Sequence, residues 1–112
     1  MTTPRLNRQL VLEARAQVPD GSGGFSEVWS PLGTHWAEVT ARVGSERSES
    51  GTPVSQVSYR VVVRAAPVGA LSRPAADQRF REGPRVLKIV AVAEADADGR
   101  YLACTCVEEI AA

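Results

Sequence analysis

The residues of this sequence that could do chemistry are few, and the first group is acidic. Glu94, Asp96 and Asp98 precede Gly99 with the spacing that opens a calcium-binding loop. Such a loop needs a glutamate at its twelfth position, which Thr105 occupies here. The flanking segments alternate as strands do, whereas a calcium loop of this kind joins two helices. We therefore interpret the segment as a solvated hairpin turn and expect no metal ion.

No combination of residues favours catalysis. His35 is the only histidine, and no G-x-S-x-G motif accompanies it. Glu108 and Glu109 are adjacent, so on a strand they face opposite ways and cannot act as a carboxylate pair. The glycine-rich segment 21–24 lacks the Lys-Ser/Thr of a phosphate-binding loop. We expect a protein that is not an enzyme and that binds no cofactor.

The two cysteines, Cys104 and Cys106, stand two residues apart in a predicted strand. Their Cα atoms would lie about 6.6 Å apart on one face, a poor geometry for a disulfide. With a single distant histidine they do not make a zinc site either. We expect two reduced thiols that are buried or half-buried.

A local excess of positive charge is the remaining candidate site. It consists of Arg73, Arg79, Arg81 and Arg85, partly neutralised by Asp77 and Glu82. One interpretation is a solvated loop with exposed ion pairs. The other is a docking surface for an acidic partner or for phosphates, with salt-sensitive contacts. No series of aromatic residues accompanies the arginines, so a platform for stacking single-stranded nucleic acid is not expected.

Composition limits the partners further. The chain has 112 residues, enough for one domain, with 13 basic and 13 acidic side chains. No global field therefore favours nucleic acid, membranes or acidic substrates. No stretch approaches the ~18 apolar residues of a membrane span. We expect a soluble protein, made in the cytoplasm, with no membrane contact.

The elements that carry these residues are predicted to be strands. Segment 54–64 alternates apolar and polar residues with a period of two, apart from Val62, and indicates a long half-buried strand. Similar patterns predict further strands at 6–18, 25–30, 35–43, 86–93 and 100–110. Segment 86–93 is apolar on both faces, which indicates a strand covered on both sides. Asp98-Gly99 favours a tight hairpin turn.

Two segments are predicted to be long loops. Segment 44–53 contains no large apolar residue, and segment 65–84 is rich in proline and glycine. The predicted fold is a single all-β domain over 1–112, a small antiparallel β-barrel or sandwich of about six strands. It has these two loops and at most a short helix. The expected core consists of Leu10, Leu12, Val39, Val57, Tyr59, Val61, Val63, Leu87, Ile89, Val92 and Leu102.

Several segments, taken in order, resemble the phage head-tail joining (head-closure, or stopper) family. The resemblance covers about Leu6 to Glu109. Its pieces are Leu6-Asn7-Arg8, Phe25 with Glu27 and Trp29, Trp36-Ala37-Glu38-Val39, Gly44-Ser45-Glu46, Tyr59-Arg60-Val61, Arg85 to Val92, and Tyr101-Leu102 with Cys106 to Glu109. None of these motifs is catalytic. Their order and spacing carry the match.

The resemblance implies a structural subunit in the neck of a tailed phage or gene transfer agent particle. Such a subunit forms a ring, a hexamer in preference to a dodecamer, between the portal adaptor protein and a tail terminator or tail tube protein. It retains DNA in the channel without sequence specificity. The alternative class is a small nucleic-acid-binding β-barrel module.

The resemblance also suggests a gate. We expect the polar loop to point into the channel of the ring and to narrow it. Its residues are Gly44, Ser45, Glu46, Arg47, Ser48, Glu49, Ser50, Gly51, Thr52 and Pro53.

Overall fold

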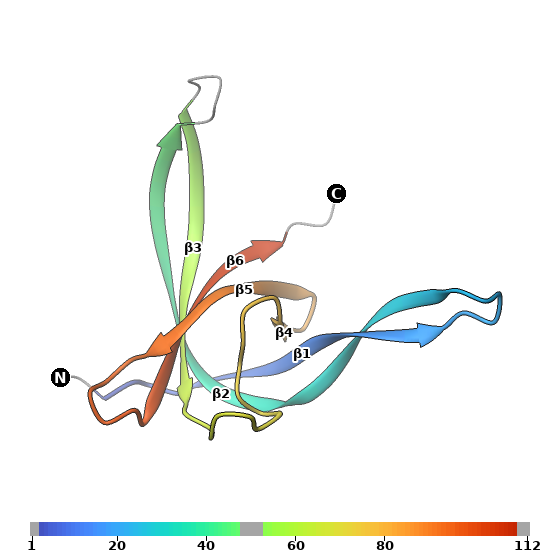
Figure 1. The fold of residues 1–112 in the computed structure, drawn as a ribbon. Coiled ribbons are helices and arrows are strands. Elements are labelled where there is room, and N and C mark those ends of the chain that lie inside the picture. Colours follow the sequence, from blue (N-terminus) through green and yellow to red (C-terminus); the bar gives the residue numbers. More distant parts are fainter. Residues whose placement is uncertain (1–2, 48–52, 110–112) are drawn as a thin grey trace.

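Six antiparallel strands make up the fold in the computed structural model, which describes residues 3–47 and 53–109. The strands are β1 (Arg8–Pro19), β2 (Phe25–Arg47), β3 (Pro53–Arg64), β4 (Arg79–Glu82), β5 (Arg85–Glu94) and β6 (Tyr101–Glu109). They close into a barrel in the order β1-β2-β3-β6-β5-β4 (Figure 1). The predicted small antiparallel barrel is confirmed. The described residues contain no helix, and therefore none that could cross a membrane.

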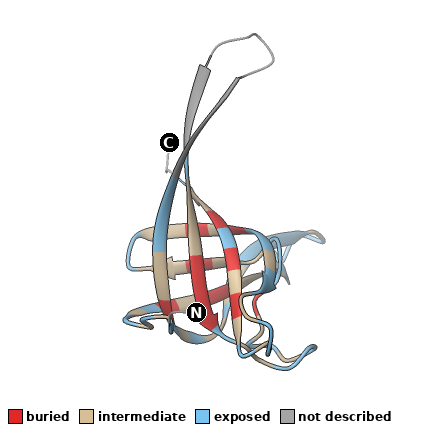
Figure 2. Cartoon of the chain, turned by 90° about the vertical axis from the view of Figure 1, so that its left-hand side faces the viewer, coloured by how far each residue is buried: buried red, intermediate tan, exposed pale blue. Residues whose placement is uncertain are grey.

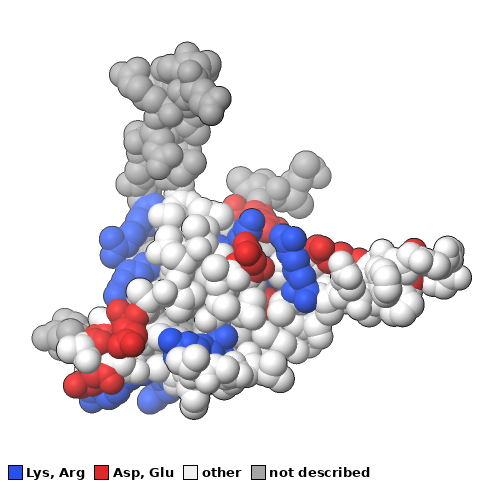
Figure 3. Space-filling model, in the orientation of Figure 1, with Lys and Arg blue, Asp and Glu red and all other residues white. Residues whose placement is uncertain are grey.

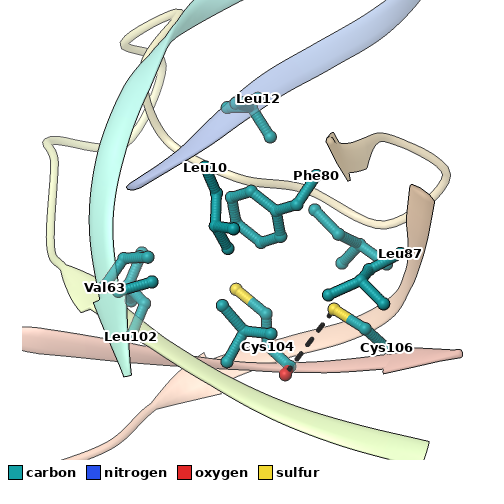
Figure 4. Packing of buried hydrophobic residues seen from close by; sticks show 11 residues of the cluster. Leu10, Leu12, Val63, Phe80, Leu87, Leu102, Cys104 and Cys106 are labelled. Carbon is teal, nitrogen blue, oxygen red and sulfur yellow. Dashed lines mark hydrogen bonds between the residues drawn. The ribbon is translucent and has the colours of Figure 1, made fainter. Parts of the chain in front are cut away.

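The barrel core comes from the inward-facing positions of all six strands. Phe80, the largest fully buried residue, lies among leucine side chains of β1, β5 and β6 (Figure 4). Seven of the expected core residues are buried: Leu10, Leu12, Val61, Val63, Leu87, Ile89 and Leu102. Val39, Tyr59 and Val92 are partly buried and pack against the cluster. Val57 was predicted wrongly, because it lies where β3 leaves the barrel and is 45 % exposed.

Both cysteines lie in this core with no exposed surface and are free thiols. Burial raises the pKa of Cys104 to about 12, and burial together with the neighbouring Cys104 raises that of Cys106 to about 12. Reactive thiolate is therefore scarce at neutral pH in the folded chain.

Turns with side-chain hydrogen bonds join the strands. Between β1 and β2, the Oδ1 of Asp20 accepts hydrogen bonds from the backbone N–H groups of Ser22 and Gly24, at 2.8 and 3.1 Å. Between β5 and β6, the Oδ1 of Asp96 accepts the backbone N–H groups of Arg100 and Tyr101. Gly99 has a φ of 67° there, a conformation that favours glycine. A hairpin turn at the predicted place is confirmed, although the connection between β5 and β6 spans residues 95–100 and is longer than a tight Asp-Gly turn.

The prediction of a break in the second strand was wrong. β2 runs without interruption from Phe25 through Pro31 and Gly33. Leu12 pairs with Gly33 and Glu13 pairs with Pro31, so Leu32 is the extra residue of a β-bulge. A bulge accepts proline because the ladder is already locally interrupted there.

The two loops were predicted too long. Gly44 to Arg47 belong to β2 and pair with Pro53 to Gln56 of β3, while 48–52 lie outside the described residues. The two strands of a ribbon that leaves the barrel pair with each other, so the segment needs no apolar alternation toward a core. In the second loop, β4 closes the barrel between β1 and β5. Its four residues contain one apolar side chain, too few for a visible period.

The fifth strand is buried on one face only, contrary to the prediction. Ile89 pairs with Cys106 and Ala91 with Thr105, so Val90 is the extra residue of a bulge and is 53 % exposed. Val62, which breaks the alternation of β3, faces outward yet is only 1 % exposed. It lines a hollow with Thr3 and Pro4 of the N-terminal segment, which crosses this face of the sheet. Figure 2 shows that, among the residues whose burial is described, the buried ones lie in the barrel.

Candidate functional site: two projections and two charge clusters

Two β-ribbons project from the barrel in different directions (Figure 1). We call residues 14–19 paired with 25–30 the β1–β2 arm, and residues 43–47 paired with 53–57 the β2–β3 ribbon. The Cα radius of gyration is 16.0 Å. A compact domain of this length would have about 13 Å. The projections account for the excess, and they are the surfaces on this chain with the greatest reach.

The β1–β2 arm has one face without any charge. Facing residues of an antiparallel pair point to the same side, so the register of the arm assigns each residue to a face. The uncharged face consists of Ala14, Ala16, Val18, Ser26, Val28 and Ser30. The opposite face carries the Arg15–Trp29 and Gln17–Glu27 pairs, with Phe25 next to the turn. In Figure 3 the arm is largely uncharged, with acidic side chains along one border.

A clamp of two arginines on one carboxylate holds the root of this arm. Glu13 of β1 is 5 % exposed. Its Oε1 accepts a hydrogen bond from Nε of Arg79 at 2.8 Å, and its Oε2 accepts one from Nε of Arg81 at 2.9 Å. Both arginines belong to β4, so the clamp ties the short closing strand to the strand that leads into the arm. Charge-assisted bonds of this kind are among the stronger ones in proteins.

The same clamp reaches the arm through Trp29. The guanidinium carbon of Arg79 lies 4.1 Å from the centroid of the Trp29 ring, and that of Arg15 lies 5.3 Å from it. Both distances are within the range of a cation–π interaction. The direction in which the arm leaves the barrel is therefore held by β4 as well as by the β1–β2 ladder.

The Glu13 clamp predicts a measurable stability loss. Burial would raise the pKa of Glu13, but the hydrogen bonds from Arg81 and Arg79 hold it below its ordinary value. Replacing Glu13 by glutamine should lower the free energy of unfolding by about 2 kcal/mol in urea titrations near neutral pH, since two arginines lose their counter-charge. A lowered carboxyl pKa contributes stability above about pH 4.3, which is lost as the pH falls through the folded-state value. The free energy of unfolding of the variant should therefore depend less steeply on pH in that acidic range than that of the wild type.

The matched control is Glu27→Gln in the same arm. Glu27 is also paired with an arginine, Arg15, but at 3.8 Å and with 53 % of its side chain exposed. Such a surface pair is worth about 0 to 1 kcal/mol. Equal losses of unfolding free energy in Glu13→Gln and Glu27→Gln would contradict a stabilising role of the Glu13 clamp.

A second charge cluster closes the end of the barrel from which the β2–β3 ribbon leaves. Nε of Arg8 donates to Glu82 at 2.9 Å, and Nε of Arg85 donates to Glu108 at 2.8 Å. The hydroxyl of Tyr59 donates to Glu108 at 3.1 Å, and Arg85 lies 3.8 Å from Glu82. The cluster therefore joins β1, β3, β4, β5 and β6 around the base of the ribbon. The Arg8 bond lowers the pKa of Glu82, and the Arg85 bond lowers that of Glu108.

The four arginines predicted as a docking surface are not one patch. Arg79 and Arg81 lie on β4 and share Glu13, while Arg85 begins β5 and belongs to the second cluster. Arg73 lies apart from them in the 65–78 loop, where its Nη1 donates to the carbonyl of Ala66 at 2.7 Å. Their placement in a single loop was wrong, because β4 and β5 draw three of them into the barrel wall. Docking through them stays a prediction.

The contacts of Asp96 and His35, the other groups considered for metal binding or catalysis, are those of a turn and of side-chain packing. The Oδ1 of Asp96 accepts the backbone N–H of Arg100 in the turn after β5. No cluster of potential metal ligands occurs in residues 3–47 and 53–109. The ring of His35 meets that of Phe80 edge to face, with centroids 6.2 Å apart. Burial lowers the pKa of His35.

The β1–β2 arm itself was missed as a surface. The alternation of its residues predicts strands correctly, but in this arm the alternation continues after both strands have left the barrel, so it does not reveal where they leave. One feature of the sequence does distinguish the arm from the barrel. The positions that should face a core there are occupied by alanine, serine and valine, whereas the barrel half of the same strand has Leu10 and Leu12.

Comparisons with known proteins identify a family and a similar solved structure. A family model described as phage head completion protein matches residues 1–109. A chain of a solved structure entitled "Virion of native gene transfer agent (GTA) particle" is 49 % identical and superposes with a TM-score of 0.76. That match covers 97 % of this chain and 100 % of the other. No curated protein sequence matches.

Proposed function

Because the chain belongs to the phage head completion protein family, we propose that it forms a ring in the neck of a phage or gene transfer agent particle and retains packaged DNA. The family is made of structural virion proteins. The observation that carries the proposal for this chain is its shape, a compact barrel with two projecting ribbons that have ion pairs at their bases (Figure 1). A ring subunit must contact its own copies and also reach an axial channel, and two projections in different directions serve these two needs.

The neighbours in the proposed neck follow from the family. The ring lies between the portal adaptor protein and a tail terminator or tail tube protein, with six copies preferred over twelve. DNA would pass along the axis without sequence-specific contacts. The balanced total of 13 basic and 13 acidic side chains is consistent with a channel that does not hold DNA by net charge.

We assign the gate to the β2–β3 ribbon, which includes five of the ten residues of the segment 44–53, namely 44–47 and 53. The ribbon extends the pairing of β2 and β3 for at least five residue pairs beyond the last β3–β6 pair, Ser58 with Val107. At about 3.4 Å per residue this is a reach of about 17 Å before the described strands end. Ribbons from several subunits that converge at this reach would narrow an axial channel.

The proposed function is tested with particles that lack this chain. Heads assembled without it should package DNA but lose it on purification and carry no tails, and added wild-type chain should restore both properties. Electron microscopy measures head filling and tail attachment, and quantitative mass spectrometry measures copies per particle. Tailed, DNA-filled particles in the absence of the chain would overturn the proposal.

A further inference from the structure

The tip of the β1–β2 arm exposes a large aromatic residue. Phe25 is 67 % exposed and pairs with Pro19 beside the turn. A two-stranded ribbon is marginally stable in water when nothing packs against it. Phe25 lies on the same face as Glu27, opposite the uncharged face. The chain itself leaves Phe25 exposed, and it leaves Val18 and Val28 of the uncharged face exposed as well.

A second apolar surface lies in the loop between β3 and β4. Val68 is 87 % exposed and Leu71 is 75 % exposed. Leu71, Leu32 and Pro74 line a hollow of about 260 Å³, together with the polar side chains of Arg73 and Gln78. No charged residue precedes Arg73 in the segment 65–72. The hollow therefore combines apolar side chains with one cation in its lining.

The arm cannot reach the hollow of its own chain. Leu32, which lines the hollow, lies on the same strand as Phe25 and seven positions away. An extended strand rises about 3.3 Å per residue, which places the two residues about 23 Å apart. Glu13 and its arginines hold the arm in its outward direction. Phe25 can fill such a hollow only on another copy.

We propose that the arm of one subunit docks on the 65–74 loop of the next copy, with Phe25 entering the hollow lined by Leu32, Leu71 and Pro74. The charges agree with this pairing, because the arm carries Asp20 and Glu27 close to Phe25 while Arg73 lines the hollow. Aromatic side chains that fill apolar pockets commonly dominate interface energies. The inference rests on the proposed function, and it names the contact that builds the ring.

The arrangement is head-to-tail. Arm and hollow are different surfaces of the same chain, so each copy offers one of each and the contact repeats until a ring closes. One arm face, about 20 Å long and 10 Å wide, covers about 200 Å². That is far less than the ~800 Å² per partner of a stable interface. The isolated chain should therefore be monomeric at micromolar concentration and assemble when a neighbouring ring aligns the subunits.

Disulfide trapping tests the contact. The double variant Phe25→Cys with Leu71→Cys should give, in particles treated with a thiol oxidant, a ladder of linked oligomers up to a closed ring on non-reducing gels. The native thiols do not compete, because Cys104 and Cys106 are buried. Either single variant alone should remain uncrosslinked, and an equal mixture of the two should stop at dimers. Phe25→Cys with Val90→Cys is the matched control, since Val90 is also exposed but lies on β5, and it should give no ladder.

The outcomes separate this inference from the proposed function. Absence of the ladder in particles that contain the double variant at wild-type copy number overturns the inference and leaves the ring intact. Dimers formed by Phe25→Cys alone also overturn it, since they indicate two arms meeting symmetrically. If the double variant alone does not enter particles, particles assembled from the double variant mixed with wild-type chain are oxidised instead, and linked dimers or their absence there decides in the same way.

Discussion

Truncation of Phe80 to alanine should lower the free energy of unfolding by about 4 kcal/mol. Phe80 is fully buried, and it pairs across the barrel wall with Leu12 of β1 on one side and Leu87 of β5 on the other (Figure 4). Its loss removes apolar contact from both neighbours and from the edge of the His35 ring. A domain has about 5–15 kcal/mol of total stability, so the variant should be close to unfolding. Urea denaturation followed by circular dichroism measures the change.

The effect should be large because Phe80 belongs to the strand that closes the barrel. β4 has four residues, and its pairing with β1 is limited to Val11, Leu12 and Glu13. So short a strand is held by its side chains, namely Phe80 toward the core and Arg79 and Arg81 toward Glu13. Phe25→Ala is the matched control, since Phe25 is 67 % exposed, and it should change stability by at most about 0.5 kcal/mol. Similar losses in the two variants would show that Phe80 does not anchor the closure.

The parts of the fold that could be predicted from sequence are those with a long alternating pattern. The apolar positions of segment 54–64 identified Val61 and Val63 as core, and Asp98-Gly99 identified the turn between β5 and β6. These features are local, because a half-buried strand has a period of two wherever it stands.

The parts that were missed depend on tertiary pairing. Phe80 stands between Arg79 and Arg81 after a proline-rich stretch, and four residues do not establish a period. The bulge at Leu32 lets β2 continue through Pro31, which read alone ends a strand. The β2–β3 ribbon has no apolar alternation, because its strands pair with each other outside the barrel. In each case a partner strand far away in sequence decides the structure.

The candidate site divides in the same way. The arginines at 79, 81 and 85 were visible as a charge excess, but their shared carboxylates, Glu13 and Glu108, lie on strands far away in the sequence. Sequence proximity grouped the arginines as one loop, whereas the barrel separates them into a clamp at the arm and a cluster at the ribbon base.

Shortening the β2–β3 ribbon should make filled heads leak. Deletion of 44–47 together with 53–56 removes four facing pairs, from Gly44 with Gln56 to Arg47 with Pro53. The ribbon then loses about 14 Å of reach. An even number of residues is removed from each strand, so the remaining residues keep their faces. A decrease of only about 1.4 kcal/mol in the barrier to DNA escape is tenfold in rate. We therefore expect DNA loss from purified tailless heads to become at least about tenfold faster, measured as nuclease-sensitive DNA over time.

Two controls distinguish the length of the β2–β3 ribbon from its charge, and from the stability of the barrel, as the cause of DNA retention. The deletion leaves the barrel intact, since β3 begins to pair with β6 only at Ser58, and thermal unfolding of the purified variant should confirm this. The length-preserving control, Glu46→Gln with Arg47→Gln, removes the charges and keeps the ribbon, so its heads should hold DNA nearly as well as the wild type. Heads with the shortened ribbon that retain their DNA would place the gate elsewhere in the ring. Equal leakage from the length-preserving control would mean that charge, and not reach, holds the DNA.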